Sequence, residues 1–202
     1  MNLDCIIDRG VMSPVYANLI GVASLPIIMC ILTFVVWTPI KLCAKGMTWS
    51  DYQQYLKGTL VNILFILHPT ILQHSMIMFT CTTIDNTSYL DTYMEDECWT
   101  GDHWTYATAV AIPSFLLWGI GLPFMAFRIL VKKNKAETLW DQKCMKKYGF
   151  LYLGFNRKKY WWSFVILTRK VFILANLIWL SQISTVVQAL TAIAFLWFCI
   201  YL

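Results

Sequence analysis

Five long apolar segments, separated by polar stretches, dominate the hydropathy pattern of this chain. They cover residues 15–40, 58–81, 107–131, 160–180 and 183–202. A helix needs about 20 apolar residues to cross the hydrocarbon core of a bilayer, and each segment approaches or exceeds that length. The pattern therefore predicts an all-α, polytopic transmembrane bundle of about five spanning helices, which forms a single domain over residues 1–202.

Prolines and short turns refine this prediction. Pro113 and Pro123 predict that the third helix is bent, because proline removes a backbone donor from the helical ladder. Ser181 and Gln182 are the only residues between the last two segments. Such a short connection predicts that these two helices form an antiparallel hairpin.

The composition agrees with a membrane protein. Hydrophobic residues make up 58% of the chain, charged residues 13%, and the mean hydropathy is +0.58. Soluble domains contain about 25% charged residues. The net charge of +5 is therefore best read by its position along the chain, and not as a sign of nucleic-acid binding.

The charges alternate between the loops. The predicted loop 132–159 is rich in Lys and Arg, as is the stretch between the first two segments, whereas loop 82–106 has six acids and no Lys or Arg. Cytoplasmic loops of membrane proteins carry the excess of Lys and Arg. We therefore predict that the N-terminus and the acidic loop 82–106 lie outside, and that the basic loop 132–159 and the C-terminus lie inside.

The outer loop contains a candidate disulfide and a candidate glycosylation site. Cys81 and Cys98 bracket the loop, and a bond between them would close 18 residues, worth about 3 kcal/mol in the chain-entropy model. The alternative is two unpaired thiols. Asn86 begins an Asn-Thr-Ser acceptor sequence on the same loop.

The acids of the outer loop allow two interpretations. They attract cations near a pore mouth, or they form a solvated face with no ligand. No EF-hand spacing organises them as a calcium site. The acids are Asp85, Asp91, Glu95, Asp96, Glu97 and Asp102.

Four polar residues fall inside predicted spans. His68 and His74 lie in the second segment, where we expect an interhelical hydrogen bond in preference to a proton or metal role. Arg169 and Lys170 lie about ten residues into the fourth segment, where a charge needs a partner, water or snorkelling. We expect Arg169 to meet a carboxylate, a carbonyl or a lipid phosphate.

A basic surface is predicted on the inner side, next to many aromatic residues. This combination suits anionic lipid headgroups and an aromatic belt. Its cations are Lys132, Lys133, Lys146, Lys147, Arg157, Lys158 and Lys159.

The sequence offers no pattern for catalysis. We find no nucleophile with a base, no Gly-rich phosphate loop and no CxxC or other zinc motif. We therefore expect no enzyme, no metal and no cofactor.

Several motifs between residues 67 and 170 resemble the C-terminal multi-pass region of large protist cysteine-rich surface proteins, of ciliate or oomycete type. More remotely, the region resembles fungal TRP-like membrane proteins. The residues that carry the likeness are His68 to Ile71, Ser88 to Leu90, Glu97 to Trp99, His103, Pro113, Trp118, Gly121, Pro123, Tyr148 to Tyr152, Gly154, Tyr160 to Trp162, Arg169 and Lys170.

The resemblance implies a channel-like or receptor-like membrane module, which we expect to be a fragment of a longer protein or a chain completed by copies of itself or by other membrane subunits. A bond between Cys81 and Cys98 and a glycan on Asn86 would favour the plasma membrane or the secretory pathway. The alternative is a non-catalytic accessory subunit of a large membrane complex, such as one in the mitochondrial inner membrane.

Overall fold

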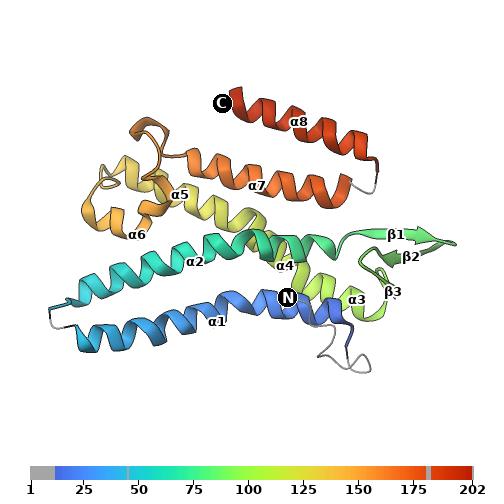
Figure 1. The fold of residues 1–202 in the computed structure, drawn as a ribbon, viewed down its shortest axis with the longest axis horizontal. Coiled ribbons are helices and arrows are strands. Elements are labelled where there is room, and N and C mark those ends of the chain that lie inside the picture. Colours follow the sequence, from blue (N-terminus) through green and yellow to red (C-terminus); the bar gives the residue numbers. More distant parts are fainter. Residues whose placement is uncertain (1–11, 45, 181–182, 202) are drawn as a thin grey trace. The chain divides into compact units, whose positions relative to one another are not determined.

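Helices make up most of the structure, a computed structural model that describes residues 12–44, 46–180 and 183–201 (Figure 1). The α-helices are α1 (Pro14–Cys43), α2 (Trp49–Ile77), α3 (Gly101–Tyr106), α4 (Ile112–Phe115), α5 (Leu122–Lys135), α6 (Gln142–Tyr152), α7 (Trp162–Trp179) and α8 (Thr185–Tyr201). Two π-helical segments, η1 (Ala107–Ala111) and η2 (Leu116–Gly121), lie between α3 and α5, and the 3-10 helix η3 (Arg157–Lys159) precedes α7.

Four helical stretches in the described residues are long and apolar enough to cross a membrane. They are α1, α2, the stretch Gly101–Lys135, and α7. Helix α8 is also apolar but has 17 residues. The prediction of apolar helices that suit a bilayer is therefore confirmed, with four candidate spans where five were predicted. The orientation in the membrane stays a prediction.

Helix α2 begins at Trp49 instead of at residue 58, because its N-terminus is capped. The Thr48 hydroxyl donates to the Asp51 carboxylate over 2.7 Å, and the Asp51 backbone N–H donates to the Thr48 oxygen over 3.3 Å. This exchange resembles a capping box, which satisfies backbone donors at a helix start. The helix therefore includes an N-terminal part of polar and aromatic residues that precedes the apolar segment.

The stretch Gly101–Lys135 is helical throughout but irregular. Its π-helical segments η1 and η2 flank Pro113, which stands near the start of α4. Proline lacks a donor for the helical ladder, and π-helical turns occur where that ladder is disturbed. The irregularity lies where the sequence predicts a bend.

A three-stranded antiparallel sheet corrects the all-α prediction. Its strands β1 (Cys81–Ile84), β2 (Thr87–Leu90) and β3 (Tyr93–Glu97) follow one another in space as in sequence (Figure 1). Asp85 and Asn86 join β1 to β2 with φ values of 48° and 66°. Two-residue hairpin turns of type I′ need positive φ at both positions, and Asp and Asn tolerate it. The strands have only four or five residues with mixed burial, so the sequence contains no clear alternating pattern from which to predict this sheet.

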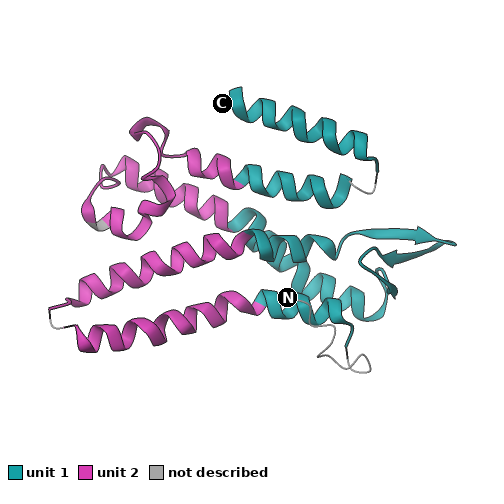
Figure 2. Ribbon diagram, in the orientation of Figure 1, with its two compact units in different colours: residues 1–23, 69–121, 168–202 teal, residues 24–68, 122–167 magenta. Residues whose placement is uncertain are grey.

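The chain divides into two compact units, each made of segments that are distant in sequence (Figure 2). Unit 1 comprises residues 1–23, 69–121 and 168–202, and unit 2 comprises residues 24–68 and 122–167. The division runs through the continuous helices α1, α2 and α7. It therefore leaves the single-domain prediction untested.

In unit 1, helices α7 and α8 form the predicted antiparallel hairpin. Phe172 stacks on Phe195, with 3.7 Å between the ring centroids. The Asn176 amide donates to the Thr191 hydroxyl over 2.5 Å, and Gln188 donates to the carbonyl of Leu177 over 3.4 Å. Residues later in α7 thus pair with residues earlier in α8, as antiparallel packing requires. The predicted Ser181-Gln182 turn lies outside the described residues.

Unit 2 has its core beneath the basic loop. Leu130, Leu139, Cys144, Leu151 and Tyr152 are buried together and pack against α2. The Tyr152 hydroxyl donates to the carbonyl of Leu139. Burial, and after it the Cys144 thiol, raises the pKa of the Tyr152 phenol, so this group stays protonated as a donor.

Candidate functional site

A disulfide closes the cap of unit 1, defined here as the sheet with the ends of α1, α2 and α3 around it. Cys81 opens β1 and Cys98 directly follows β3, and the structure joins them over a Cα–Cα distance of 6.4 Å. The bond therefore links the two outer strands across β2. A short sheet of this kind is marginal by itself, and the covalent link compensates for its small core. The predicted disulfide is confirmed.

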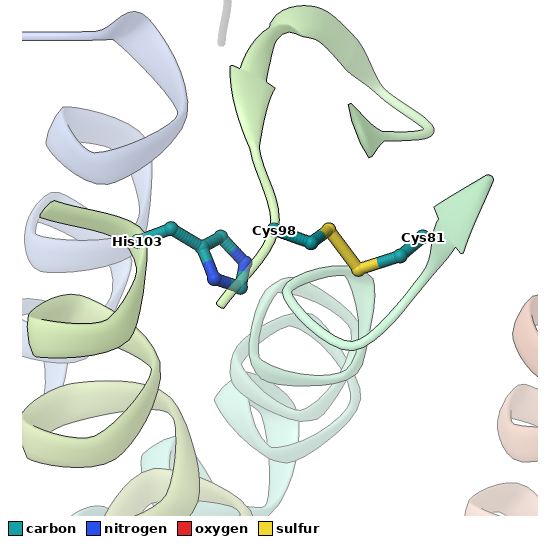
Figure 3. A group of neighbouring side chains, drawn as sticks. All are labelled: Cys81, Cys98 and His103. Atoms are coloured by element: carbon teal, nitrogen blue, oxygen red, sulfur yellow. A yellow bond between two sulfur atoms is a disulfide. The ribbon is translucent and has the colours of Figure 1, made fainter. Parts of the chain in front are cut away.

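His103 sits beside the disulfide and joins two elements of the cap (Figure 3). Its Nδ1 accepts the backbone N–H of Trp99 over 3.0 Å, and its Nε2 lies 3.1 Å from the carbonyl oxygen of Met78. A backbone N–H can only donate and a carbonyl can only accept. The imidazole therefore has its proton on Nε2 and is neutral, and its buried ring holds the start of α3 against the end of α2.

The first turn of α1 completes the cap. Tyr16 stacks on Tyr106 at 4.6 Å between ring centroids and meets the His103 ring edge-on at 6.5 Å. The Ser13 hydroxyl donates to the Asp96 carboxylate over 2.5 Å. These contacts tie the start of α1 to β3 and to the third helical stretch within unit 1.

An open cleft of about 610 Å³ lies in the cap between the start of α1 and β3. Three of the predicted outer acids line it, namely Glu95, Asp96 and Asp102. Asp96 is held by Ser13, whereas Asp91 lies elsewhere and accepts from the Thr82 hydroxyl over 3.0 Å. The structure thus brings half of the six acids to one cleft. Whether they attract cations stays a prediction.

Cys81, Cys98 and His103 place three potential metal-ligand atoms within 4.8 Å of one another. Metal ions bind thiolates and a free imidazole lone pair. In this structure the two sulfurs are bonded to each other, and the Nδ1 lone pair already accepts from Trp99. The group therefore does not fit a metal in its oxidised form.

Asn86 is exposed in the β1–β2 turn. Ser88 of the acceptor sequence is partly buried, with its hydroxyl 3.1 Å from that of Thr83. The sequon therefore stands at an accessible hairpin tip. Its modification stays a prediction.

The four polar residues predicted to lie inside the membrane have different environments. His68 is fully buried, whereas His74 is partly buried. Arg169 and Lys170 are both exposed on α7, and within the described residues neither side chain has a hydrogen bond or ion pair to the protein. The partner predicted for Arg169 is therefore not supplied by the described part of this chain, and its contact with a lipid phosphate stays a prediction.

The basic surface surrounds aromatic rings in unit 2. Lys146 lies over Tyr55 at 5.5 Å, Arg157 over Trp140 at 5.0 Å and Lys159 over the ring of Trp162 at 5.1 Å, each measured to the ring centroid. All seven predicted cations are exposed or partly exposed. Cation–π contacts of this kind hold the charged groups at fixed positions over their rings.

The sequence analysis did not single out two residues whose contacts shape this region. Lys41, counted only as a loop charge, lies 3.5 Å from the ring centroid of Trp49. Gly58 lies so close to α6 that a Cβ would come 2.8 Å from the carbonyl oxygen of Lys146. The first has no clear signal, because its ring partner Trp49 lies on the next helix. The second likewise has no local signal, because it depends on the packing of α2 against α6.

Comparisons with known proteins support the membrane assignment. The chain is 30% identical over 123 residues to Cysteine repeat modular protein A of Toxoplasma gondii. That stretch is 56% of this chain but 4% of the relative, so the chain corresponds to a small part of that protein. No solved structure matches the chain.

A family match covers almost the whole sequence. Residues 11–201 match the family described as Transient receptor potential (TRP) ion channel. The matched range contains all the described helices and the disulfide-closed cap. The TRP-like part of the predicted resemblance is confirmed, and the likeness to ciliate or oomycete proteins stays a prediction. The chain belongs to the Transient receptor potential (TRP) ion channel family.

Proposed function

We propose that this chain is a transmembrane module of a TRP-like channel or receptor, with ions passing through an assembly of chains and not through this chain alone. The observation that carries the proposal is the family match over residues 11–201, together with the four helices that suit a bilayer. The family is one of ion channels, so we propose no catalytic activity. No observation favours the accessory-subunit alternative.

A surface or secretory location fits the chemistry of the cap. The disulfide between Cys81 and Cys98 needs an oxidising compartment to form and persist. Asn86 is exposed beside it. We propose that the cap faces the outside of the cell or the lumen of the secretory pathway, with a glycan on Asn86. If glycosidase treatment leaves the mass of the native protein unchanged, the glycan is excluded.

The basic surface of unit 2 is proposed to face anionic headgroups on the opposite side. Juxtamembrane lysines and arginines are attracted to anionic lipids by about 1 kcal/mol each. The aromatic rings beneath Lys146, Arg157 and Lys159 suit the membrane interface, where Trp and Tyr are enriched. No nucleic acid is needed to explain this charge.

The test is a purification of the native protein in mild detergent, followed by identification of everything that copurifies. Recovery of further copies of this chain, or of a longer version that carries it, supports the channel module. Recovery of a fixed set of unrelated subunits in constant proportion contradicts the channel proposal and favours an accessory role.

A further inference from the structure

We propose that the seam between α1 and α2 in unit 2 binds one anionic phospholipid, with an acyl chain in an apolar groove and its phosphate beside Lys41 and Lys146. This inference rests on the proposed membrane placement of the chain, and it does not require that the chain conduct ions.

The seam contains a groove with an apolar wall. Its volume is about 220 Å³, and its lining includes Met29, Leu32 and Val36 from α1 and Ile63 from α2. Leu32 and Val36 are 49% and 54% exposed, so the groove opens on the outer surface of the helix pair. Both helices are candidate spans, which places this surface among acyl chains.

The polar atoms of the groove are already satisfied within the protein. The Thr33 hydroxyl donates to the carbonyl of Met29 over 2.7 Å. The Thr59 hydroxyl donates to the carbonyl of Tyr55 over 2.9 Å and accepts from the indole N–H of Trp37 over 3.2 Å. A water molecule needs two to four polar partners to occupy a cavity. The groove therefore favours hydrocarbon over water.

Two pairs of aromatic rings follow the groove toward the charged end of the seam, Trp37 with Tyr55 and Trp49 with Tyr52, and we call these four rings the cradle. Trp37 stacks on Tyr55 with 5.5 Å between centroids and 6° between planes, and Trp49 packs near Tyr52 at 5.3 Å. Trp37 belongs to both the groove and the cradle. The cradle is thus the boundary between the apolar wall and the charged end of the seam.

Two lysines lie over the cradle. The Lys41 ammonium is 3.5 Å from the Trp49 centroid and 5.3 Å from that of Tyr52, and the Lys146 ammonium is 5.5 Å from that of Tyr55. The rings fix the positions of both charges without using their N–H donors. The Asp51 carboxylate near this end of α2 accepts from the Thr48 hydroxyl in the helix cap.

The order along α1 matches the order of groups in a phospholipid. From Met29 to Trp37 the groove extends about 12 Å along the helix, and Lys41 lies about 6 Å further, at 1.5 Å per residue. An acyl chain in the groove would thus have its phosphate near the lysines. A detached phosphate ion would use the lysines but leave the groove unfilled, so we assign the site to a membrane lipid.

The test is native mass spectrometry of the full chain in detergent, titrated with dioleoyl phosphatidylglycerol or with dioleoyl phosphatidylcholine. We expect preferential binding of phosphatidylglycerol. The double variant Lys41→Gln, Lys146→Gln should weaken this binding by about fivefold for each lysine and abolish the preference. Leu32→Trp, which fills the groove, should weaken binding of both lipids.

Two control variants match these changes in chemistry. Lys57→Gln removes an exposed lysine of α2 that does not line the groove, and Ile27→Trp adds an indole on the opposite side of α1 from the groove. Both should bind like the original chain. Equal binding of the two lipids, or a lysine variant that keeps its preference, overturns the headgroup assignment. Unchanged binding by Leu32→Trp overturns the groove. This experiment measures lipid binding and not ion current. A chain that conducts no ions would therefore contradict the channel proposal but not the lipid site.

Discussion

The cap of unit 1 and the seam of unit 2 hold their polar groups in different ways. In the cap, Cys81 and Cys98 are bonded to each other, and both ring nitrogens of the buried His103 have hydrogen-bond partners in the backbone. In the seam, aromatic rings position Lys41 and Lys146, and among the described residues neither ammonium donates a hydrogen bond to the protein. Groups whose bonds are satisfied internally serve the fold, whereas groups that are fixed in place with free donors are able to bind a ligand. Substitutions in the cap should therefore lower the stability of the protein, whereas substitutions of the seam lysines should mainly weaken lipid binding.

The largest effect is expected from removal of the disulfide. The double variant Cys81→Ser, Cys98→Ser should lower the stability of the cap by about 3 kcal/mol, because it frees a closed loop of moderate length. Thermal unfolding followed by fluorescence-detected size exclusion measures the change. Cys43→Ser, at an exposed free cysteine, is the control, and an equal loss in both would show that the disulfide has no special role.

A smaller loss is expected at His103. His103→Phe retains a ring in the buried position but leaves the Trp99 N–H and the Met78 carbonyl without their partner, at a cost of about 2 kcal/mol. The same thermal assay reports it. His103→Gln supplies both an acceptor and a donor, so it should recover part of the loss. Equal stability of the Phe variant and the original chain would contradict the bridging role.

Packing between α2 and α6 gives the next test, in unit 2. Gly58→Ala introduces a Cβ at 2.8 Å from the carbonyl oxygen of Lys146, so the backbones must separate. We expect a loss of about 1 kcal/mol, at the lower end for overpacked sites. Gly21→Ala is the control, because no atom lies within 4 Å of its added Cβ. A thermal midpoint for Gly58→Ala that matches this control would show that α6 does not approach α2 so closely.

The smallest effect on stability is expected at Lys41. Lys41→Gln removes a cation–π contact with Trp49, worth about 0.5 kcal/mol at an exposed site. Its thermal midpoint should therefore stay close to that of the original chain while its binding of phosphatidylglycerol falls. A stability loss as large as that of the disulfide variant would mean that Lys41 serves the fold, and the contrast between the two regions would fail.

The long helices could be predicted from the sequence because their signal is local. A run of about 20 consecutive apolar residues is typical of a membrane-spanning helix. The boundaries of α7 lie within two residues of those predicted. The pairing of Cys81 with Cys98 was also within reach, because both cysteines bracket one loop on the predicted oxidising side. The start of α2 was harder, since the cap at Thr48 precedes a polar turn that contributes nothing to hydropathy.

The remaining features depend on contacts between distant segments. The sheet has strands of four or five residues with mixed burial, too short and too polar to give a clear alternating pattern. The role of His103 follows from the position of Met78, which lies 25 residues earlier. Likewise, Lys41 resembles any loop lysine until Trp49 is found beneath it. In these cases the sequence gives the type of side chain, but it does not show which distant residue that side chain contacts.

The most direct test of the channel proposal is a planar-bilayer recording of the natively purified assembly that contains this chain. The account predicts a cation-selective current that a channel blocker or removal of the assembly abolishes. An intact assembly, verified by its mass, that gives no cation current above that of the empty bilayer under a range of voltages and lipids would contradict the account.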